Sequence, residues 1–279
     1  DNVPPFDFNL VKDVVNRDIF KDFDEIPFKS ASIGQVHKAT LKNGKKVVVK
    51  LKRPGIYNIM QSDTENVKKI LDFIQSIGID TGSSSNFVLN DSIEYLLGEA
   101  DYRQEVENAI KFKRSLKDID WIKVPYVYKK YCTDDMIVME YVEADKITDI
   151  KNKKINRKKV CEALVNSYVI QTMDSGLFHG DPHPGNLAIS KDGKLVFYDF
   201  GLLIELNDEL KQGFGDLFGC IIKRDTKGIV QILIKLGVIV PTSSDVSDIE
   251  VFFETILGYL ENLDGGAIMN DELAAELAM

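Results

Sequence analysis

The sequence HGDPHPGN at residues 179–186, followed by DFG at residues 199–201, decides which fold this chain can adopt. Apolar stretches at 187–189 and 195–198 flank an Asp192-Gly193 turn, which predicts a β-hairpin between the two motifs. Phosphoryl transfer needs positioned phosphates, a cation that neutralises charge, and a carboxylate beside the attacking group. The two motifs contain residue types suited to the last two needs. We therefore expect the chemistry of the chain to be centred here.

In protein kinases, an H-x-D loop supplies the carboxylate, and an Asn that follows at a fixed spacing reaches a metal ion. The Asp of the DFG turn binds the metal that bridges the phosphates. Asp181 and Asn186 have the required spacing, and Asp199 begins the DFG turn. We predict that Asp181 is catalytic and that Asn186 and Asp199 bind Mg²⁺. Taken singly, each would be an ordinary turn residue, and His183 is expected to be a structural residue of the loop.

A lysine follows the β-branched run at 47–49 and matches the kinase strand lysine that holds the α- and β-phosphates. Upstream, residues 29–36 align with the glycine-rich pattern G-x-G-x-x-G-x-V, but Lys29 and Ala31 replace its first two glycines. A loop with fewer glycines is stiffer and follows phosphates less freely. The nucleotide contacts predicted in this region are Ala31, Ser32, Ile33, Gly34, Val36 and Lys50.

An apolar strand is predicted at 136–139, and the residues after it are expected to connect two lobes. In a kinase this connection hydrogen-bonds the adenine through its backbone. We therefore predict Glu140 and Val142 as nucleotide contacts, although an edge strand without a ligand fits these residues equally well.

Several motifs together resemble the UbiB/ADCK family of atypical kinases. They are SASIGQVH at 30–37, VK at 49–50, RPGI at 53–56, the E-x-D-Y segment at 99–102, and HGDPHPGN at 179–186. The resemblance extends from about residue 3 to residue 240. It implies an α+β, bilobal protein-kinase-like fold, with a small antiparallel-sheet N-lobe that carries inserted helices and a mainly helical C-lobe. It also implies that Glu105 pairs with Lys50 and acts with it in catalysis.

The chain departs from the family pattern at two places. The family usually has a small residue at the position of Lys29, whose side chain could reach phosphates or point into solvent. The family's K-x-G-Q signature is absent upstream of the alanine-rich stretch, and we expect the printed chain to begin just after it. Glu99 and Asp101 would then lack the partner that this segment provides in the family.

The order of patterns predicts an N-lobe at 1–145 and a helical C-lobe at 146–279. An amphipathic helix is expected over Asp7–Ile26, because apolar residues recur there at helical spacing. The remaining expected elements are a strand–turn–strand unit at 33–51, helices at 56–77 and 87–116, strands within 124–142, and a polar linker at 151–154.

The composition limits the partners and the compartment. The net charge of −9 over 279 residues argues against nucleic-acid binding. The three cysteines are isolated, which favours a reducing compartment: the cytoplasm, the mitochondrial matrix or a plastid. No apolar run is long enough to span a bilayer, and no targeting signal is visible. Apolar residues at 87–97 are compatible with peripheral membrane contact, although packing in the core is the more usual role of such a stripe.

The leading hypothesis is a Mg²⁺-dependent, ATP-binding atypical kinase or ATPase. The absence of an A-P-E segment after DFG argues against protein substrates. The family resemblance implies a small-molecule substrate or a supporting role in prenyl-quinone biosynthesis. It also makes ATP or ADP, membrane lipids, quinone precursors and a biosynthetic protein complex the expected partners. The alternatives are a nucleotide-binding pseudokinase scaffold and a kinase of the aminoglycoside or choline type.

Overall fold

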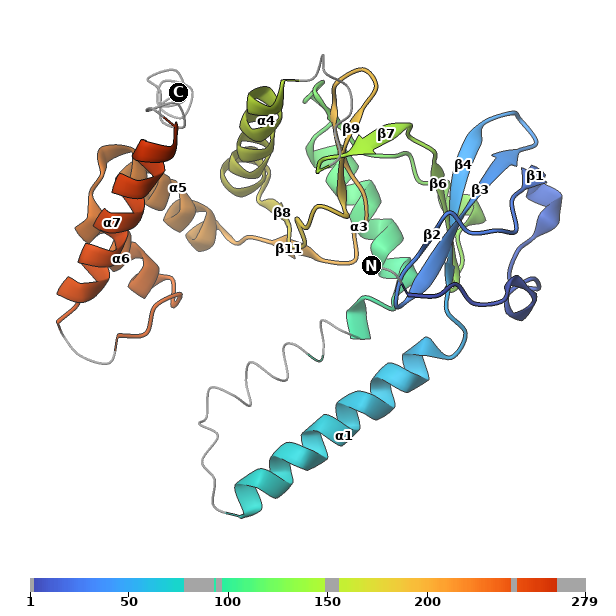
Figure 1. The fold of residues 1–279 in the computed structure, drawn as a ribbon, viewed down its shortest axis with the longest axis horizontal. Coiled ribbons are helices and arrows are strands. Elements are labelled where there is room, and N and C mark those ends of the chain that lie inside the picture. The colour runs from blue at the N-terminus through green and yellow to red at the C-terminus, as the bar shows by residue number, and fades with distance from the viewer. Residues whose placement is uncertain (1–2, 78–92, 94–96, 149–155, 242–244, 265–279) are drawn as a thin grey trace. The chain divides into compact units, whose positions relative to one another are not determined.

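The computed structural model describes residues 3–77, 93, 97–148, 156–241 and 245–264. It divides into two compact units, each made of two chain segments (Figure 1). The first unit is Asp1–Ile155 with His179–Leu203, and the second is Asn156–Phe178 with Ile204–Met279. The predicted lobes at 1–145 and 146–279 stay a prediction. The predicted linker at 151–154 and most of the apolar stripe at 87–97 lie outside the described residues.

The first unit contains an antiparallel sheet in the order β1-β3-β4-β6, with β2 also paired to β3. Val47, Val49 and Val138 are fully buried in this sheet. Their β-branched side chains pack well on its pleated surface. The strand–turn–strand unit and the strand at 136–139 are confirmed. The strands are β1 (Phe20–Phe23), β2 (Lys29–Ser30), β3 (Gly34–Leu41), β4 (Lys46–Lys52) and β6 (Met136–Glu140).

The turn between β3 and β4 closes through two backbone hydrogen bonds. Gly44 N–H donates to the Leu41 carbonyl at 2.8 Å, and Leu41 N–H donates to the Lys45 carbonyl at 2.9 Å. Gly44 has a φ of 83°, whereas Asn43 does not adopt a positive φ. The connection therefore needs one left-handed residue, and the glycine provides it.

The amphipathic helix predicted at Asp7–Ile26 is wrong. The segment forms the single turns η1 (Phe8–Leu10) and η2 (Arg17–Ile19) and then enters β1. The side chains of Asp7 and Asn16 accept hydrogen bonds from backbone N–H groups two residues later, which competes with a continuous helix. The helical spacing of its apolar residues instead reflects burial against the sheet, to which Val11 and Val15 contribute.

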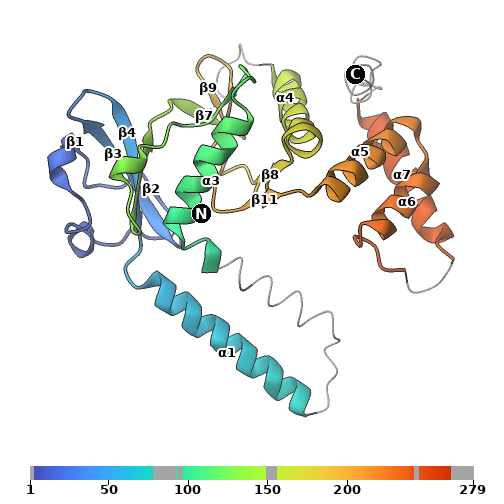
Figure 2. The same ribbon diagram turned by 180° about the vertical axis from the view of Figure 1, so that it is seen from behind.

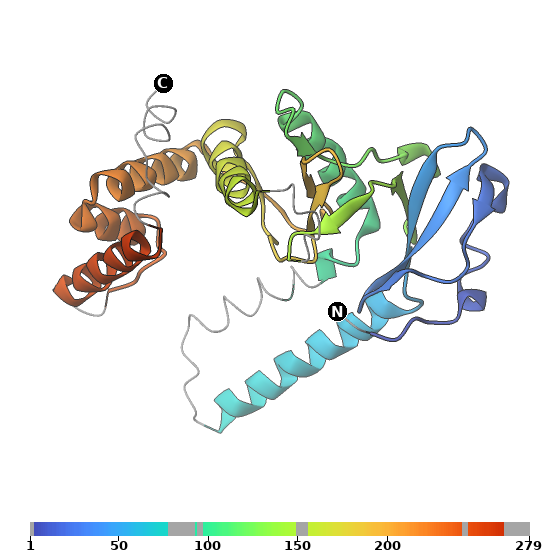
Figure 3. The ribbon, with the colours of Figure 1, turned by 45° about the horizontal axis from the view of Figure 1, so that its top comes forward.

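A second sheet, in the order β5-β10-β9-β7, completes the first unit. Its antiparallel β9–β10 pair is the hairpin predicted between the two motifs. The helix α3 lies beside this sheet (Figure 3). It packs against the sheet through the Phe112 and Phe197 rings, whose centroids are 5.4 Å apart. The elements are α1 (Ile56–Ser76), α3 (Tyr102–Ser115), β5 (Ile122–Lys123), η3 (Lys129–Tyr131), β7 (Ala144–Lys146), β9 (Leu187–Ser190) and β10 (Leu195–Phe197).

The second unit is mainly helical, as the patterns predict for the C-terminal half. Asn207 caps the start of α5 by accepting from Leu210 N–H, and α5, α6 and α7 follow one another in contact (Figure 2). In the helices that the structure describes, no stretch is both long and apolar enough to cross a membrane. The helices are α4 (Arg157–Val169), the π-turn η4 (Ile170–Ser175), α5 (Asp208–Lys223), α6 (Thr226–Lys235) and α7 (Ser247–Asp264). The short strands β8 (Leu177–His179) and β11 (Leu203–Glu205) pair with each other.

Candidate active site

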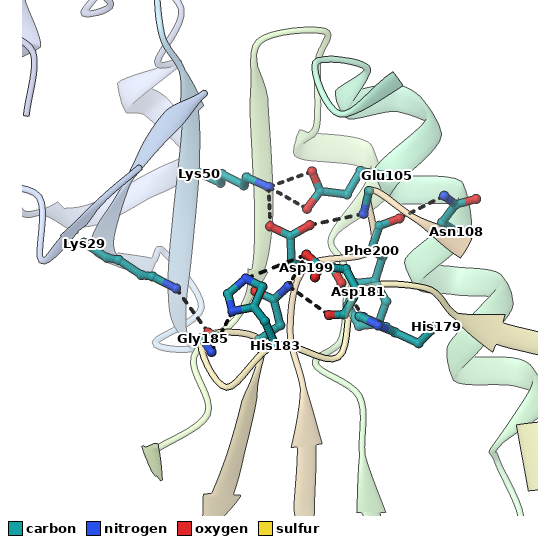
Figure 4. Close-up of polar contacts among 12 residues, drawn as sticks. Lys29, Lys50, Glu105, Asn108, His179, Asp181, His183, Gly185, Asp199 and Phe200 are labelled. Atoms are coloured by element: carbon teal, nitrogen blue, oxygen red, sulfur yellow. Dashed lines mark hydrogen bonds and ion pairs between the residues drawn. The ribbon is translucent and has the colours of Figure 1, made fainter. Parts of the chain in front are cut away.

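Lys50 in β4 and Glu105 in α3 form a buried ion pair within the first unit. The Lys50 Nζ lies 2.8 Å from both carboxylate oxygens of Glu105 (Figure 4). The Glu105 side chain is only 2% exposed, so water hardly screens the pair. The structure thus joins the lysine that the strand pattern singled out and the glutamate that the family resemblance assigned to it.

Local capping explains why α3 carries Glu105 to this point. Asp101 is the N-cap, and its side chain accepts hydrogen bonds from the N–H groups of Arg103 and Gln104. Glu105 therefore lies in the first helical turn, where the helix dipole favours a negative charge. Tyr102, fully buried beside it, places its ring 5.1 Å from the Lys50 ammonium.

Asp199 brings the DFG motif to the same lysine. Its Oδ2 lies 3.2 Å from Lys50 Nζ, and its Oδ1 accepts a hydrogen bond from Gly201 N–H at 3.2 Å. Asp199 has a φ of 54°, a left-handed conformation that few residues other than glycine adopt and that Asp tolerates better than most. The carbonyl of Asp199 lies 2.7 Å from His179 Nε2, which holds the turn from the other side. Lys50 therefore contacts two carboxylates from distant parts of the chain.

Charge and burial act in opposite directions on these carboxylates. Burial raises the pKa of Glu105 to about 7, although the ammonium of Lys50 counteracts the rise. Burial also opposes ionisation of Asp199, but Lys50 and the Gly201 N–H outweigh it and hold the pKa of Asp199 below its ordinary value. The pKa of Lys50 is raised, because attraction to Asp199 and Glu105 exceeds the cost of burial. Lys50 therefore keeps its positive charge at neutral pH.

The catalytic loop (residues 179–186) folds back on itself. The amide nitrogen of Asn186 donates to Asp181 Oδ2 at 3.0 Å, so the two residues with kinase-like spacing are in direct contact. His183 accepts a hydrogen bond from Gly185 N–H through Nδ1, and its Nε2 lies 3.7 Å from Asp181 Oδ2. A Cβ at Gly185 would overlap the His183 ring, so a larger residue there would have to displace that ring. His183 is thus hydrogen-bonded within the loop although its side chain is 44% exposed, and Asp181 is held by Asn186.

The alanine-rich loop (residues 30–36) is held by Arg53. Its guanidinium donates to the Ser32 carbonyl at 2.9 Å and to the Ala31 carbonyl at 3.2 Å. Its backbone N–H also donates to the Ile33 carbonyl at 2.7 Å. A Cβ at Gly34 would overlap both the Tyr102 hydroxyl and the Leu51 carbonyl. The glycine is therefore needed for close packing on α3 and β4, in addition to any contact with phosphates.

Glu140 and Val142 occupy the end of β6 and the residues after it. The Glu140 carboxylate pairs with Lys123 at 2.6 Å, and its backbone N–H donates to the Tyr126 carbonyl at 2.8 Å. The Val142 carbonyl accepts a hydrogen bond from the Tyr198 hydroxyl at 3.4 Å. Both residues thus already have partners within the protein, and their contact with an adenine stays a prediction.

Known proteins are similar to this chain over most of its length. The family model described as the ABC1 atypical kinase-like domain matches residues 1–233. The chain belongs to this family. Relatives of the ABC1 domain include ACTIVITY OF BC1 COMPLEX KINASE 7, chloroplastic, from Arabidopsis thaliana, which is 34% identical over 94% of this chain. The probable protein kinase UbiB of Shewanella sp. strain ANA-3 is 33% identical over 92% of this chain.

A solved structure with a similar fold is that of Rv3197 from Mycobacterium tuberculosis, determined as a complex with erythromycin. It has a TM-score of 0.70 and 24% identity, and the match covers 91% of this chain and 67% of that one. The predicted protein-kinase-like α+β fold is confirmed, and so is the UbiB/ADCK resemblance. The chain spans 39% of the plant relative and 49% of the Shewanella relative.

The ABC1 domain has oxygen ligands that suit a Mg²⁺ ion. The Asp199 carboxylate is ionised, and the Asn186 amide nitrogen is the atom that donates to Asp181, which leaves the amide oxygen for a cation. Within the described residues, no cluster of three or more His, Cys, Asp or Glu side chains could enclose a metal ion by itself. Magnesium sites in nucleotide enzymes usually need only one or two protein ligands, since phosphates and water complete the coordination. The residues present therefore fit this ion.

Sequence reasoning missed three parts of the ABC1 site. The anchoring role of Arg53 was not predicted, although RPGI was noted as a family motif. Asn108 donates to the Phe200 carbonyl at 2.8 Å and so fixes the DFG turn on α3. Its position one turn after Glu105, on the same helix face, is the signal that would have suggested it. The contact of Lys29 with Gly185 depends on the folded chain and leaves no local pattern.

Proposed function

We propose that this ABC1 domain binds ATP with Mg²⁺ and acts as a phosphotransferase or ATPase. The observation that carries the proposal is the contact of Lys50 with both Glu105 and Asp199. In protein kinases, the lysine–glutamate ion pair and the DFG aspartate must both be in place for activity. Lys50 would hold the α- and β-phosphates, and Glu105 would keep its ammonium in position.

Asp199 and Asn186 would bind Mg²⁺, which would neutralise the charge on the phosphates. Asp181 would orient the water or hydroxyl group that attacks, since its carboxylate lies at the catalytic loop and is held there by Asn186. The alanine-rich loop and the backbone near Glu140 and Val142 would contact the rest of the nucleotide.

The proposed acceptor is a small molecule, and the proposed context is prenyl-quinone biosynthesis. The support is the family relationship, together with the short segment that follows the DFG motif. The strand β11 follows almost directly, and α5 begins at Asp208, so this part of the chain has no long peptide-docking segment. The names of the plant relatives make a plastid the favoured compartment.

Thermal melting with ATP or ADP, each with and without Mg²⁺, tests the nucleotide site. At a hundred times the dissociation constant, a ligand stabilises a protein by about 2.7 kcal/mol, which is an easily measured shift. We expect a magnesium-dependent shift that Asp199→Asn abolishes. Asp118→Asn is the matched control, because Asp118 is 85% exposed and its ion-pair partner is the neighbouring Lys117.

Other outcomes would decide between the alternatives. A normal magnesium-dependent shift in Asp199→Asn would contradict the assignment of the metal site. A shift without nucleotide turnover in the presence of lipids or quinone precursors would favour the pseudokinase scaffold. Turnover stimulated by choline or an aminoglycoside would favour that type of kinase instead.

A further inference from the structure

Lys29 connects the nucleotide loop to the catalytic loop. It opens β2, pairs with Val36 across the loop hairpin, and so stands at the base of the alanine-rich loop. Its Nζ donates a hydrogen bond to the Gly185 carbonyl at 3.2 Å (Figure 4). Gly185 directly precedes Asn186. The ammonium of Lys29 therefore lies at the end of the site where the catalytic loop holds Asp181.

The charge of Lys29 is less compensated than that of Lys50. Lys50 is bonded to two carboxylates, whereas none of the ion pairs in the described part of the chain involves Lys29. Burial lowers the pKa of Lys29, attraction to Asp199 opposes this, and repulsion from Lys146 and Lys50 adds to it. An anion next to Lys29 would relieve this repulsion and the cost of burial. A neutral backbone carbonyl does so only in part.

The two lysines lie close enough for their charges to repel each other, which suits them to bind one phosphate chain together. Lys50 is fixed by β4 and α3, and Lys29 reaches the loop where the attacking group would be oriented. An ammonium on a flexible side chain binds phosphate oxygens as a mobile point charge. In protein kinases the glycine-rich loop covers the phosphates, whereas here the corresponding loop has Ala31 in place of a glycine and is anchored by Arg53. A lysine at the base of such a loop can supply a contact that the stiff backbone does not.

We propose that Lys29 binds the terminal phosphate of a nucleoside triphosphate and makes the site prefer triphosphates over diphosphates. This inference rests on the proposed nucleotide function and adds a residue where the chain departs from its family pattern. A different use of the same contact would be a latch, in which Lys29 and Gly185 hold the site closed. A latch would restrict every nucleotide equally, whereas a terminal-phosphate contact acts on triphosphates alone.

Isothermal titration calorimetry with ATP, ADP and AMP, all with Mg²⁺, separates these roles. We expect Lys29→Met to weaken ATP binding about tenfold, which corresponds to about 1.4 kcal/mol, and to change ADP and AMP binding less than about twofold. Retained ADP binding also shows that the variant is folded. Lys42→Met is the matched control, because Lys42 is exposed in the β3–β4 turn and should leave all three affinities unchanged.

Two results would overturn the inference while leaving the proposed function intact. One is ATP binding by Lys29→Met that equals that of the unchanged chain. The other is an equal change in ATP and ADP affinity, in either direction, which would assign Lys29 to a latch or to loop structure. Failure of the unchanged chain to bind any of the three nucleotides would overturn the proposed function, and this inference with it.

Discussion

Asn108 holds the DFG turn against α3, because its side-chain amide donates to the Phe200 carbonyl at 2.8 Å. Both residues are buried, and the Phe200 ring also lies 5.6 Å from that of Phe112 on the same helix. Glu105 stands one turn earlier on α3. The helix that positions the Lys50 partner therefore also positions the DFG turn that carries Asp199.

Asn108→Ala should destabilise the protein and weaken magnesium-dependent nucleotide binding together. Removing the donor leaves the buried Phe200 carbonyl without its partner, which costs about 1–3 kcal/mol. Urea unfolding and ADP titration with Mg²⁺ would measure the two effects. Gln104→Ala is the control, since it removes only the bond from Gln104 to Asn108 Oδ1. If Asn108→Ala lost stability but bound nucleotide normally, α3 would not be positioning the DFG turn.

Tyr102→Phe should leave stability unchanged or raise it slightly. The Tyr102 hydroxyl is buried and has no hydrogen-bond partner among the described residues, so its removal relieves an unsatisfied polar group.

Gly34→Ala should instead cost about 1–3 kcal/mol, because the added Cβ overlaps that hydroxyl and the Leu51 carbonyl.

Thermal melting of both single variants and the double variant checks this relationship. Combined with Tyr102→Phe, the Gly34→Ala substitution should cost less than it does alone, because one of its two clashes is gone. Strictly additive effects would mean that the backbone clash with Leu51 dominates. A large loss of stability in Tyr102→Phe alone would show that the hydroxyl has a partner.

Asp181→Asn should spare nucleotide binding and reduce turnover by about 100-fold, a loss typical of removing a group that takes up a proton. The new amide oxygen can still accept the hydrogen bond that Asn186 donates, so the loop should keep its structure. Single-turnover kinetics beside ADP titration would separate the two effects. Equal losses of binding and turnover would assign Asp181 to loop structure.

The sequence predicted those parts of the site that depend on local spacing. The Asp181–Asn186 spacing and the DFG turn are visible as motifs within short stretches, and Lys50 stands out at the end of a β-branched run. The Lys29–Gly185 contact joins residues 156 positions apart and requires knowledge of the whole fold. The helix predicted at Asp7–Ile26 failed for the opposite reason. Its apolar spacing is real, but burial against a sheet produced it.

His37 should make stability depend on pH in mildly acidic solution. It is fully buried, its Nδ1 lies 2.9 Å from the Asp24 carbonyl, and its Nε2 lies 3.1 Å from Gln35 Nε2. The Gln35 carbonyl oxygen is already occupied by Phe6 N–H, so the amide nitrogen faces the ring. This arrangement suits a neutral imidazole that donates from Nδ1 and accepts at Nε2. A proton on Nε2 would confront the amide of Gln35.

Burial accordingly lowers the pKa of His37, and Arg17 adds to this, while Asp24 and Glu25 oppose it. The unfolded chain then binds more protons than the folded one at pH values below about 6.5. Stability should therefore be retained above this pH and fall as the solution is acidified through the folded-state pKa, by at most about 1.4 kcal/mol per pH unit.

Urea unfolding from pH 7.5 to pH 5 would measure this loss. His37→Gln should be less stable at pH 7.5 but should lose less on acidification than the unchanged chain. His183→Gln, at a histidine exposed in the catalytic loop, is the matched control. Identical pH profiles for His37→Gln and the unchanged chain would show that another group is responsible.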